Sequence, residues 1–401
     1  MTLEIEKLTT GIDGMAQAAA ERLERSRETA AELLQMLNQY ADDWDNIEAA
    51  LTQAARLADP KHYRSARPFD HHLPLNATID PPAPPEEAVI IATDGSQIMP
   101  DRHAAHLYYL INIGGIVYWH GRDEAPDPFS IPELTYPRND KEAAEFAFNS
   151  GEVSILRDLR EIGTLAERAW GFRGSEAPVL AVLDQRLLYW PIGGPDASPN
   201  EDVKQWLRAM TKAHDSGAAL AGYIDRPMTT AVVTLLRSLT GIGDPKFDWR
   251  SLGKRGMGGG LTDAVLYGRL LDPGQRSKVF INVSPPNQKF AETDPANEVC
   301  FFYFNPGRGM ARVDIPRWVA EDEEMVTAVH ALLHDQCQIL GDYPYVIARA
   351  DEMAVVGRQD TENLNFLIDV TMQRYGIESR LTAKQSSKGL ARGGKTRHEG
   401  I

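Results

Sequence analysis

The sequence predicts an α/β protein: a mixed β-sheet flanked by helices, preceded by a helical arm. Residues 13–58 are rich in Ala, Leu, Glu, Gln and Arg and contain no proline and, after Gly14, no glycine, which is typical of one or two long helices. From residue 87, short apolar runs open the core as three successive strands. Beyond about residue 140 helical and apolar segments alternate, a pattern that indicates helices packed on a sheet.

Composition narrows the class of protein. The 401 residues are 43% hydrophobic and 25% charged, which is ordinary for a globular protein with one large domain. The net charge of −15 is unusual for a nucleic-acid binder, but binding uses local patches and bound cations rather than the total charge. Two cysteines give no disulfide framework, and neither a signal peptide nor a membrane-spanning run is evident. We therefore expect a soluble cytoplasmic protein with no membrane association.

The chain divides into four expected parts. Residues 1–60 form the helical arm, and 61–86 form a Pro-rich linker or an extended wrap around the core, because seven prolines fall within 59–87. Residues 87–378 form the main domain, in which Gly-rich 241–276 is an irregular excursion. Residues 379–401 form a basic tail that we expect to be disordered.

The expected elements of the main domain follow from apolar runs and turn residues. AVIIATD is a strand, AHLYYLINI (105–113) is a second strand, and Gly114-Gly115 indicates a two-residue hairpin that returns IVYWHG as a third strand. The later expected strands are 177–184, 218–225, 278–284, 298–304 and 311–316, and YPYVIARAD is expected to end as a strand at Asp351. The expected helices are 140–170, 200–216, 228–240, 319–340 and 360–375. Three antiparallel strands followed by alternating helices and strands resemble a ribonuclease H-like sheet.

Carboxylates follow several of these strands. Asp94 ends AVIIATD, Asp184 ends VLAVLD, and Asp351 ends YVIARAD. Acids gathered at one sheet edge repel each other and need a cation, and Mg²⁺ or Mn²⁺ prefers such oxygen ligands. Two such ions about 4 Å apart activate water and stabilise the leaving oxygen of a phosphodiester. The alternative is that each Asp only ends its strand as a turn or cap residue.

A further acid is expected on the helix before Asp184. Glu161 and Glu167 flank its apolar stripe, and Glu152 lies nearest to the stripe at the start of the helix. Helical geometry does not choose among the three, and each would otherwise be a solvated surface residue.

Two other motifs do not support a site. GLARGGKT (389–396) has the spacing of a phosphate loop, but it lacks the preceding strand and the following helix that such a loop requires. His330, His334 and Cys337 share a helix face without a fourth ligand, so a partly buried helix face is the expected interpretation.

Four blocks taken together resemble the NurA nuclease family: IIATDGSQ, VLAVLDQRLLYW, ARVDIPRWV and GDYPYVIARADEMAVV, in this order between about 88 and 375. The resemblance implies a ribonuclease H-like fold and manganese-dependent DNA cleavage, as a single-strand endonuclease and a 5′-to-3′ exonuclease. It also implies a homodimer that works with a HerA-type hexameric ATPase in DNA end processing and repair.

The resemblance also implies site residues. Asp94 and Asp184 match two catalytic acids, Glu161 is chosen as the helical acid with Glu167 and Glu152 kept open, and Tyr343 matches a tyrosine near the active site. In the resulting hypothesis Asp94 bridges two Mn²⁺ or Mg²⁺ ions, Glu161 and Asp184 hold one each, and Asp351 completes the site that activates water.

The sequence departs from the family at two positions. Gln185 stands where the family usually has Gly, and Asp351 stands where it usually has His. These departures motivate an alternative function as a catalytically weakened adaptor that binds the ATPase or DNA without cleaving. A third hypothesis, a phosphohydrolase of small nucleotides, would need a deep closed pocket. Arg226 and the basic tail are candidate phosphate contacts, and the helical arm is a candidate docking element for a partner or a second subunit.

Overall fold

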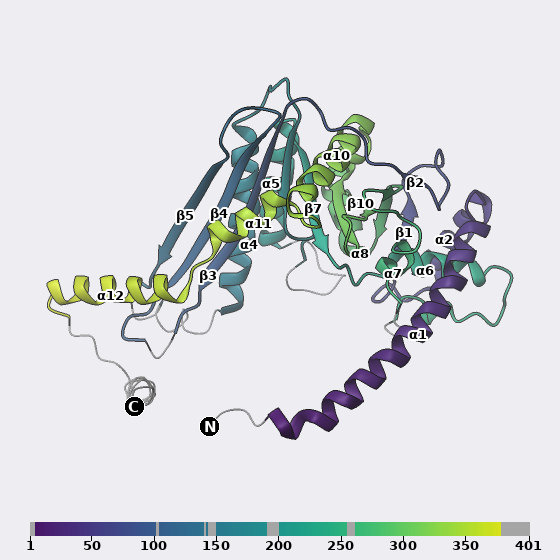
Figure 1. The fold of residues 1–401 in the computed structure, drawn as a ribbon, viewed down its shortest axis with the longest axis horizontal. Helices are drawn as coiled ribbons and strands as arrows, with labels where there is room; N and C mark the ends of the chain where they lie inside the picture. The colour runs from purple at the N-terminus through teal and green to yellow at the C-terminus, as the bar shows by residue number, and fades with distance from the viewer. Residues whose placement is uncertain are drawn as a thin grey trace.

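A mixed eleven-stranded sheet forms the centre of the molecule (Figure 1). The computed structural model of the chain describes residues 5–101, 104–139, 142, 150–190, 200–254 and 261–377. The main strand order is β1-β9-β10-β11-β7-β6-β3-β4-β5, with β8 beside β10 and β2 beside β8. The strands are β1 (Ser65–Pro68), β2 (Thr78–Ile79), β3 (Ala88–Ile98), β4 (Tyr109–His120), β5 (Asp127–Thr135), β6 (Val179–Leu183), β7 (Ala219–Asp225), β8 (Arg276–Ser277), β9 (Phe280–Val283), β10 (Val299–Phe304) and β11 (Ala311–Pro316).

Helices cover both faces of this sheet. They are α1 (Thr9–Gln39), α2 (Trp44–Leu57), α4 (Ser150–Trp170), α5 (Glu201–Asp215), α6 (Ala231–Thr240), α7 (Asp263–Tyr267), α8 (Pro285–Thr293), α9 (Arg317–Ala320), α10 (Glu323–Leu340), α11 (Tyr345–Ala354) and α12 (Arg358–Arg374). Helices α4 and α5 pack against β3, β6 and β7 on one face, while α11 crosses β3 and β4 on the other.

The sheet order confirms the predicted fold class. Strands β3, β4 and β5 form an antiparallel meander, and β6 and then β7 add in parallel on the other side of β3. Counted from β3, the spatial order is therefore 3-2-1-4-5, with a helix before each of the two parallel strands. This is the ribonuclease H-like arrangement that the sequence predicted, and it brings the exit of β6 beside Asp94 in β3.

The predicted hairpin at Gly114-Gly115 is wrong. Both glycines lie inside one continuous strand, β4 (Tyr109–His120). A Cβ on Gly114 would lie 2.0 Å from the backbone nitrogen of Ala354 in α11, and one on Gly115 would lie 2.3 Å from Cζ of Phe129. The two glycines allow neighbouring segments to approach the strand closely, and they do not form a turn. Such close approach is another common reason for glycine in a strand.

The predicted strand that ends at Asp351 is also wrong, because YVIARAD belongs to helix α11. The helix buries Val346, Ile347, Ala350 and Ala354. Residues spaced three or four positions apart lie on one face of a helix. A short apolar run does not distinguish a buried strand from a buried helix, and here the helical period decides. Asp351 is thus presented to the sheet by a helix that crosses it.

The later predicted strands and helices are found within the described residues with shifted ends, except that 319–340 divides into α9 and α10. Strand β5, the third strand of the meander, was not predicted. The Pro-rich segment adds a detail: it supplies β1, which pairs with β9, and β2, which pairs with β8. It therefore follows the course of an extended wrap. The expected excursion contains α7, whereas the basic tail from residue 379 lies outside the described residues.

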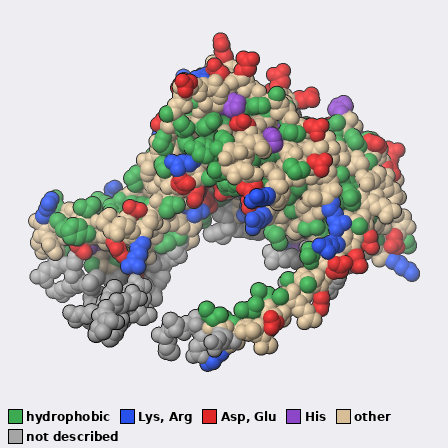
Figure 2. All heavy atoms as spheres, viewed as in Figure 1, with side chains coloured by type: hydrophobic (Ala, Val, Ile, Leu, Met, Phe, Trp, Pro, Cys, Tyr) green, Lys and Arg blue, Asp and Glu red, His purple; other side chains and the backbone are tan. Residues whose placement is uncertain are grey.

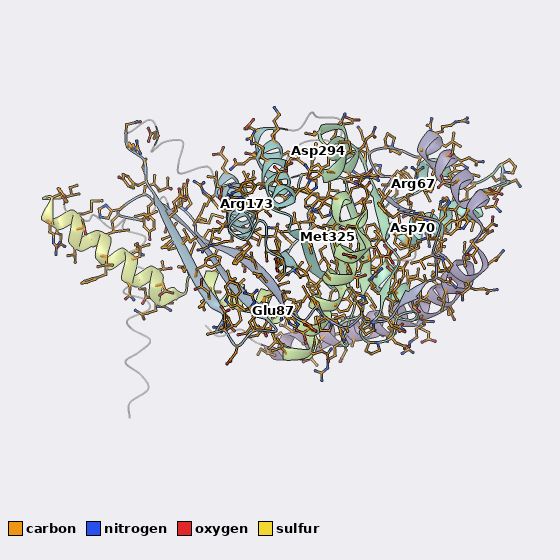
Figure 3. The ribbon with its side chains drawn as sticks, turned by 90° about the horizontal axis from the view of Figure 1, so that it is seen from above. Arg67, Asp70, Glu87, Arg173, Asp294 and Met325 are labelled. Carbon is orange, nitrogen blue, oxygen red and sulfur yellow. The ribbon has the colours of Figure 1, made fainter. Side chains whose placement is uncertain are left out.

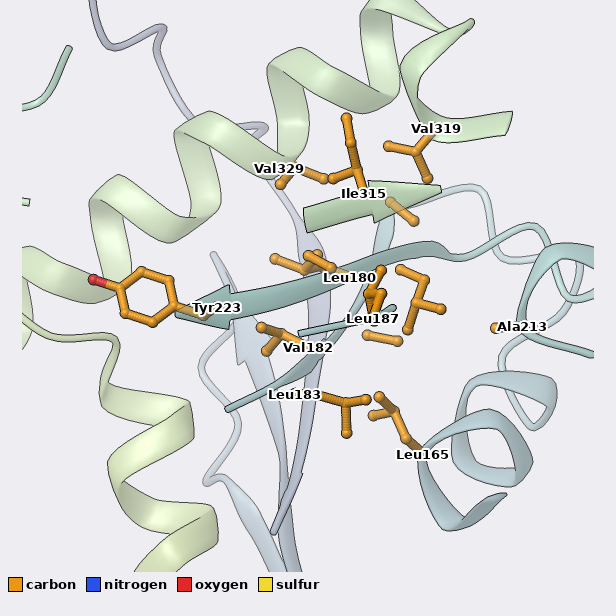
Figure 4. Close-up of a cluster of buried hydrophobic side chains, with 14 of the residues drawn as sticks. Leu165, Leu180, Val182, Leu183, Leu187, Ala213, Tyr223, Ile315, Val319 and Val329 are labelled. Carbon is orange, nitrogen blue, oxygen red and sulfur yellow. The ribbon is translucent and has the colours of Figure 1, made fainter. Parts of the chain in front are cut away.

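The largest buried cluster lies on both faces of the sheet, and a second cluster lies around β10. In Figure 4, Leu183 of β6 points to Leu165 of α4, and Ile315 of β11 lies against Val329 of α10. Around β10 the other face is covered by α1, α2, α6 and α7, where Phe301 contributes to the second cluster. The C-terminal part of the helical arm is thus packed on the main body.

Helices at opposite ends of the molecule extend from the main body. The N-terminal part of α1 and nearly all of α12 stand apart from the sheet in Figure 1, and Figure 3 shows α12 projecting in the perpendicular view as well. The space-filling view in Figure 2 shows a wide gap between these two projections. No residue of α12 is buried. Among the described helices, none is both long and apolar enough to cross a membrane.

Candidate metal centre

Asp94 and Asp184 lie at the same level of the sheet on neighbouring parallel strands. Thr93 and Leu183 form the last pair of the ladder between β3 and β6, and the two aspartates are the residues that follow. Their carboxylates therefore leave adjacent strands side by side. The convergence of these two predicted residues follows directly from the parallel register.

The side chain of Asp94 faces α11. The neighbouring Thr93 donates a hydrogen bond of 3.2 Å from Oγ1 to the backbone oxygen of Glu161, so Thr93 faces α4. Side chains alternate along a strand, which turns Asp94 to the opposite face. Gly114, its partner on β4, points the same way, because a Cβ there would meet Ala354 of α11.

Of the three candidate helical acids, Glu161 lies at this sheet edge. Glu161 is only 3% exposed, and its Oε1 accepts a hydrogen bond of 3.0 Å from Nε2 of Gln185, the residue after Asp184. Glu167 is exposed and pairs with Lys212 of α5. Glu152 lines a separate surface hollow near the start of α4. The structure thus brings Glu161 together with the strand aspartates and leaves the other two elsewhere.

Asp351 and Tyr343 reach the site from the opposite face. Asp351 lies within hydrogen-bonding reach of Asp94, where a bond forms when one of the two carboxyl groups is protonated, and the phenol of Tyr343 donates to Asp184. The Tyr343 ring packs edge-on against Tyr223 of β7, with ring centroids 5.5 Å apart. All five residues predicted for the site therefore lie around the end of β6. The prediction that Asp94 ends its strand is wrong, because β3 continues to Ile98 and Asp94 lies inside it, just beyond its last pair with β6.

Burial and mutual repulsion both disfavour ionisation in this cluster. Burial raises the pKa of Asp94, and the hydrogen bond and negative charge of Asp351 raise it further, while the Gly95 amide and Arg157 act in the opposite direction. Partial burial also raises the pKa of Asp184 to about 6, and the nearby charges of Asp94 and Asp351 add to this effect.

Glu161 is the most strongly affected acid of the cluster. Burial raises its pKa well above the usual range, and the charge of Asp94 contributes in the same direction. The hydrogen bond from Gln185 and the guanidinium of Arg157 oppose this rise. The residue that departs from the family pattern therefore makes a stabilising contact with the ionised form of Glu161.

Sequence reasoning missed two charged residues of this edge. Asp225 ends β7, and its charge contributes to the raised pKa of Asp184. The signal was available, because AALAGYID ends on an aspartate like the other strands. Arg157 of α4 forms an ion pair of 2.6 Å with Asp158 and acts on both Asp94 and Glu161. No motif marks Arg157, since only the fold brings it to the sheet edge.

The histidine and cysteine face of α10 is a buried packing surface. His330 contacts the backbone oxygen of Gly274 through Nε2 at 2.7 Å, and burial lowers its pKa to about 4. His334 and Cys337 lie on the same helix, with Cys337 buried. The phosphate-loop-like GLARGGKT lies outside the described residues.

The chemistry of the donors at the sheet edge suits a hard divalent cation. Four carboxylates provide oxygen ligands, and three of them have raised pKa values because they are buried and because their negative charges repel each other. Across the described part of the chain, however, no three Asp, Glu, His or Cys side chains are gathered as a ready-made metal site. An ion would therefore have to draw these carboxylates together.

The fold and the site define an α/β protein with a ribonuclease H-like sheet and a carboxylate cluster beside the end of β6. The sequence matches the NurA domain over residues 88–356, about two thirds of its length. The chain belongs to the NurA family.

Solved structures show more distant likeness. The crystal structure of the NurA nuclease from Sulfolobus solfataricus is 14% identical, and the comparison covers 93% of this chain and 98% of that one with a TM-score of 0.49. The crystal structure of LC9-RNase H1, a type 1 RNase H with the type 2 active-site motif, is 15% identical over 43% of this chain and 78% of that one, with a TM-score of 0.22. No curated protein matches the chain. Family membership rests on the domain match.

Proposed function

We propose that this chain is a metal-dependent deoxyribonuclease that cuts phosphodiester bonds during DNA end processing and repair. One observation carries the proposal: Asp94, Glu161, Asp184 and Asp351 come from four separate segments and meet at one sheet edge in a member of the NurA family. The name of the similar Sulfolobus protein, a NurA nuclease, points to the same chemistry.

These four carboxylates, which we call the four-acid cluster, would hold Mn²⁺ or Mg²⁺. When bound, such ions activate a water and stabilise the leaving oxygen as one P–O bond of the phosphodiester breaks. Tyr343 lowers the pKa of Asp184 through its hydrogen bond and so favours the ionised form that binds a cation. Gln185 does the same for the buried Glu161.

The finer activities follow from the family resemblance. We propose single-strand endonuclease and 5′-to-3′ exonuclease cleavage in the cytoplasm by a homodimer associated with a HerA-type hexameric ATPase. Exposed apolar side chains on the projecting helices support a role in assembly: on α1 they are Ile12, Met15 and Leu23, and on α12 they are Phe366 and Leu367. Such residues on helices that lack a packing partner are typical of interaction surfaces.

The decisive experiment compares wild type with Asp94→Asn on end-labelled single- and double-stranded DNA in Mn²⁺, Mg²⁺ or EDTA. We expect wild type to cleave only with metal and Asp94→Asn to lose cleavage while still binding DNA. Asp215→Asn, an exposed aspartate at the end of α5, is the matched control and should cleave normally. Cleavage by Asp94→Asn at the wild-type rate would refute the assignment.

The adaptor function is the second candidate. It is favoured by Gln185, whose amide already occupies one oxygen of Glu161, and by the lack of a ready-made metal site in the described residues. The same assay separates the two functions. An adaptor would bind DNA or the ATPase, but it would produce no DNA fragments with Mn²⁺, Mg²⁺ or EDTA.

A further inference from the structure

A cavity of about 780 Å³ is lined by residues of β7, β11 and α6. One lining residue, Arg186, follows Asp184 of the four-acid cluster by two positions, and another, Ile224, directly precedes Asp225. Its volume is within the range of roughly 300–1,000 Å³ that is typical of ligand pockets.

The cavity concentrates positive charge in a strongly acidic protein. Four of its lining cations form no ion pair with any acid in the described part of the chain; they are Arg64, Arg186, Arg237 and Lys254. Arg64 donates only to backbone carbonyls, those of Pro60 and Tyr63. The one acid that lines the cavity is already satisfied, because Asp314 accepts from Arg312 at 2.7 Å and from the Leu187 amide at 3.2 Å. The uncompensated charge is therefore available to an anion.

Two buried polar groups in the lining also lack partners. The hydroxyl of Ser284, a residue only 7% exposed, makes no hydrogen bond, and neither does the buried Nε of Arg237. Buried polar groups are normally satisfied, so each needs an explanation such as a ligand. Burial also lowers the pKa of Arg237 and Arg64, a cost that an anionic ligand would offset.

The N-terminus of α6 does not supply the recognition. Residues of its first turn line the cavity, but the amides of Val232 and Val233 already donate to the buried carboxylate of Asp263 at 3.2 and 2.8 Å. Anion binding here would come from arginine side chains, which suit phosphate through bidentate hydrogen bonds.

We infer that this cavity binds phosphates of a nucleic-acid strand beyond the point where the four-acid cluster acts. The inference rests on the proposed function, because a phosphodiester strand is the polyanion that would continue from a cut at the cluster into the neighbouring cavity. Arg226, exposed and next to the lining residue Pro227, would extend the same path.

Binding without cleavage tests this site. Full-length protein in EDTA is titrated into fluorescein-labelled single-stranded oligo-dT, and anisotropy is measured at several salt concentrations. We expect Arg186→Gln and Arg237→Gln each to weaken binding about tenfold, because a charge-assisted hydrogen bond is lost. Each should also reduce the magnitude of the slope of log K against log salt by about 0.7, the value for one single-strand phosphate. A variant that only disturbed packing would not change this slope.

The controls keep the outcome clear. Arg208→Gln removes an exposed, ion-paired arginine from α5 and should leave both affinity and slope unchanged. Arg186 is exposed, so its variant should fold even if the half-buried Arg237 variant does not. Unchanged affinity and slope in Arg186→Gln would overturn the inference. So would displacement of oligo-dT by 5′-dTMP at equal phosphate concentration, since that result indicates a mononucleotide site.

The test of the cavity and the test of the proposed nuclease activity can fail independently of each other. If Asp94→Asn abolishes cleavage while Arg186→Gln binds like wild type, the four-acid cluster is correct and the cavity is not. If the arginine variants lose binding but wild type cuts nothing in any metal, the cavity is correct and the nuclease assignment is not.

Discussion

Gln185 donates a hydrogen bond of 3.0 Å to the buried carboxylate of Glu161. The two residues come from different elements, the exit of β6 and the middle of α4. The bond is one of two influences that oppose the rise in the Glu161 pKa caused by burial. It makes Gln185 a positioning residue for the four-acid cluster.

Replacing Gln185 by Ala should therefore weaken the proposed metal centre. Without the amide, the pKa of Glu161 rises further and its ionised form is less available to a cation. We expect Mn²⁺ affinity or cleavage to fall roughly 10-fold or more, as for other residues that orient metal ligands. Manganese titration calorimetry measures this, with Gln97→Ala, which removes a hydrogen bond of 3.1 Å to Ser154 of α4, as the control. Equal affinity of wild type and Gln185→Ala would contradict the role.

Tyr343→Phe should shift the pH dependence of cleavage. The phenol lowers the pKa of Asp184, which stands at about 6, so its removal raises that pKa. The acid limb of the rate profile should then move up by roughly 0.5–1 pH unit, the equivalent of one hydrogen bond. Phe keeps the edge-on contact with Tyr223. Tyr345→Phe, whose ring packs edge-on against Tyr118, is the control; a shift of the same size there would disprove a specific role.

Asp184→Asn should stabilise the metal-free protein at high pH. Folding raises the pKa of Asp184 from 3.8 to about 6, so the folded state binds the proton more tightly and loses stability as pH rises through this window. Asn removes this penalty. In EDTA we expect the variant to melt above wild type at pH 8 and the difference to shrink toward pH 4.

Melting curves with added Mn²⁺ complete this test. The metal should raise the melting temperature of wild type more than that of Asp184→Asn, because ligand binding stabilises the folded state. Asp215→Asn should show neither effect. A variant less stable than wild type at pH 8 in EDTA would show that Asp184 is not held at an electrostatic cost.

Gly114→Ala should destabilise the fold and the site together. The added methyl group would lie 2.0 Å from the backbone of Ala354, so α11 would have to move away from β4. Overpacking of this kind costs about 1–3 kcal/mol, and it should also reduce cleavage because α11 carries Asp351. Gly163→Ala in α4, where a Cβ has open space, is the control and should stabilise slightly. Equal melting temperatures of Gly114→Ala and wild type would contradict the close approach.

The sequence predicted those parts of the molecule whose signals are local. The apolar runs of β3 and β6 predicted two strands, and the aspartates that follow these runs, Asp94 and Asp184, predicted a shared site, although β3 itself continues past Asp94 to Ile98. The sequence-based prediction was wrong where one residue pattern is compatible with two different structures. Gly114-Gly115 resembles a turn although it serves close packing, and the run before Asp351 fits a strand until its burial is known.

The rest of the site depends on contacts between distant segments. Three acids of α4 were equivalent by helical spacing, and only packing against the sheet distinguishes the buried Glu161 from the exposed Glu167. Arg64 and Arg237 illustrate the same limit, because 173 positions separate two arginines that line one cavity. Such proximity is a property of the tertiary fold.

The delivery of Asp351 by a helix that crosses β4 has a consequence during synthesis. A ribosome releases Asp94, Glu161 and Asp184 early, but α11 emerges only after most of the chain has been translated. A nascent chain therefore lacks one wall of the carboxylate cluster until α11 has emerged and docked across the sheet.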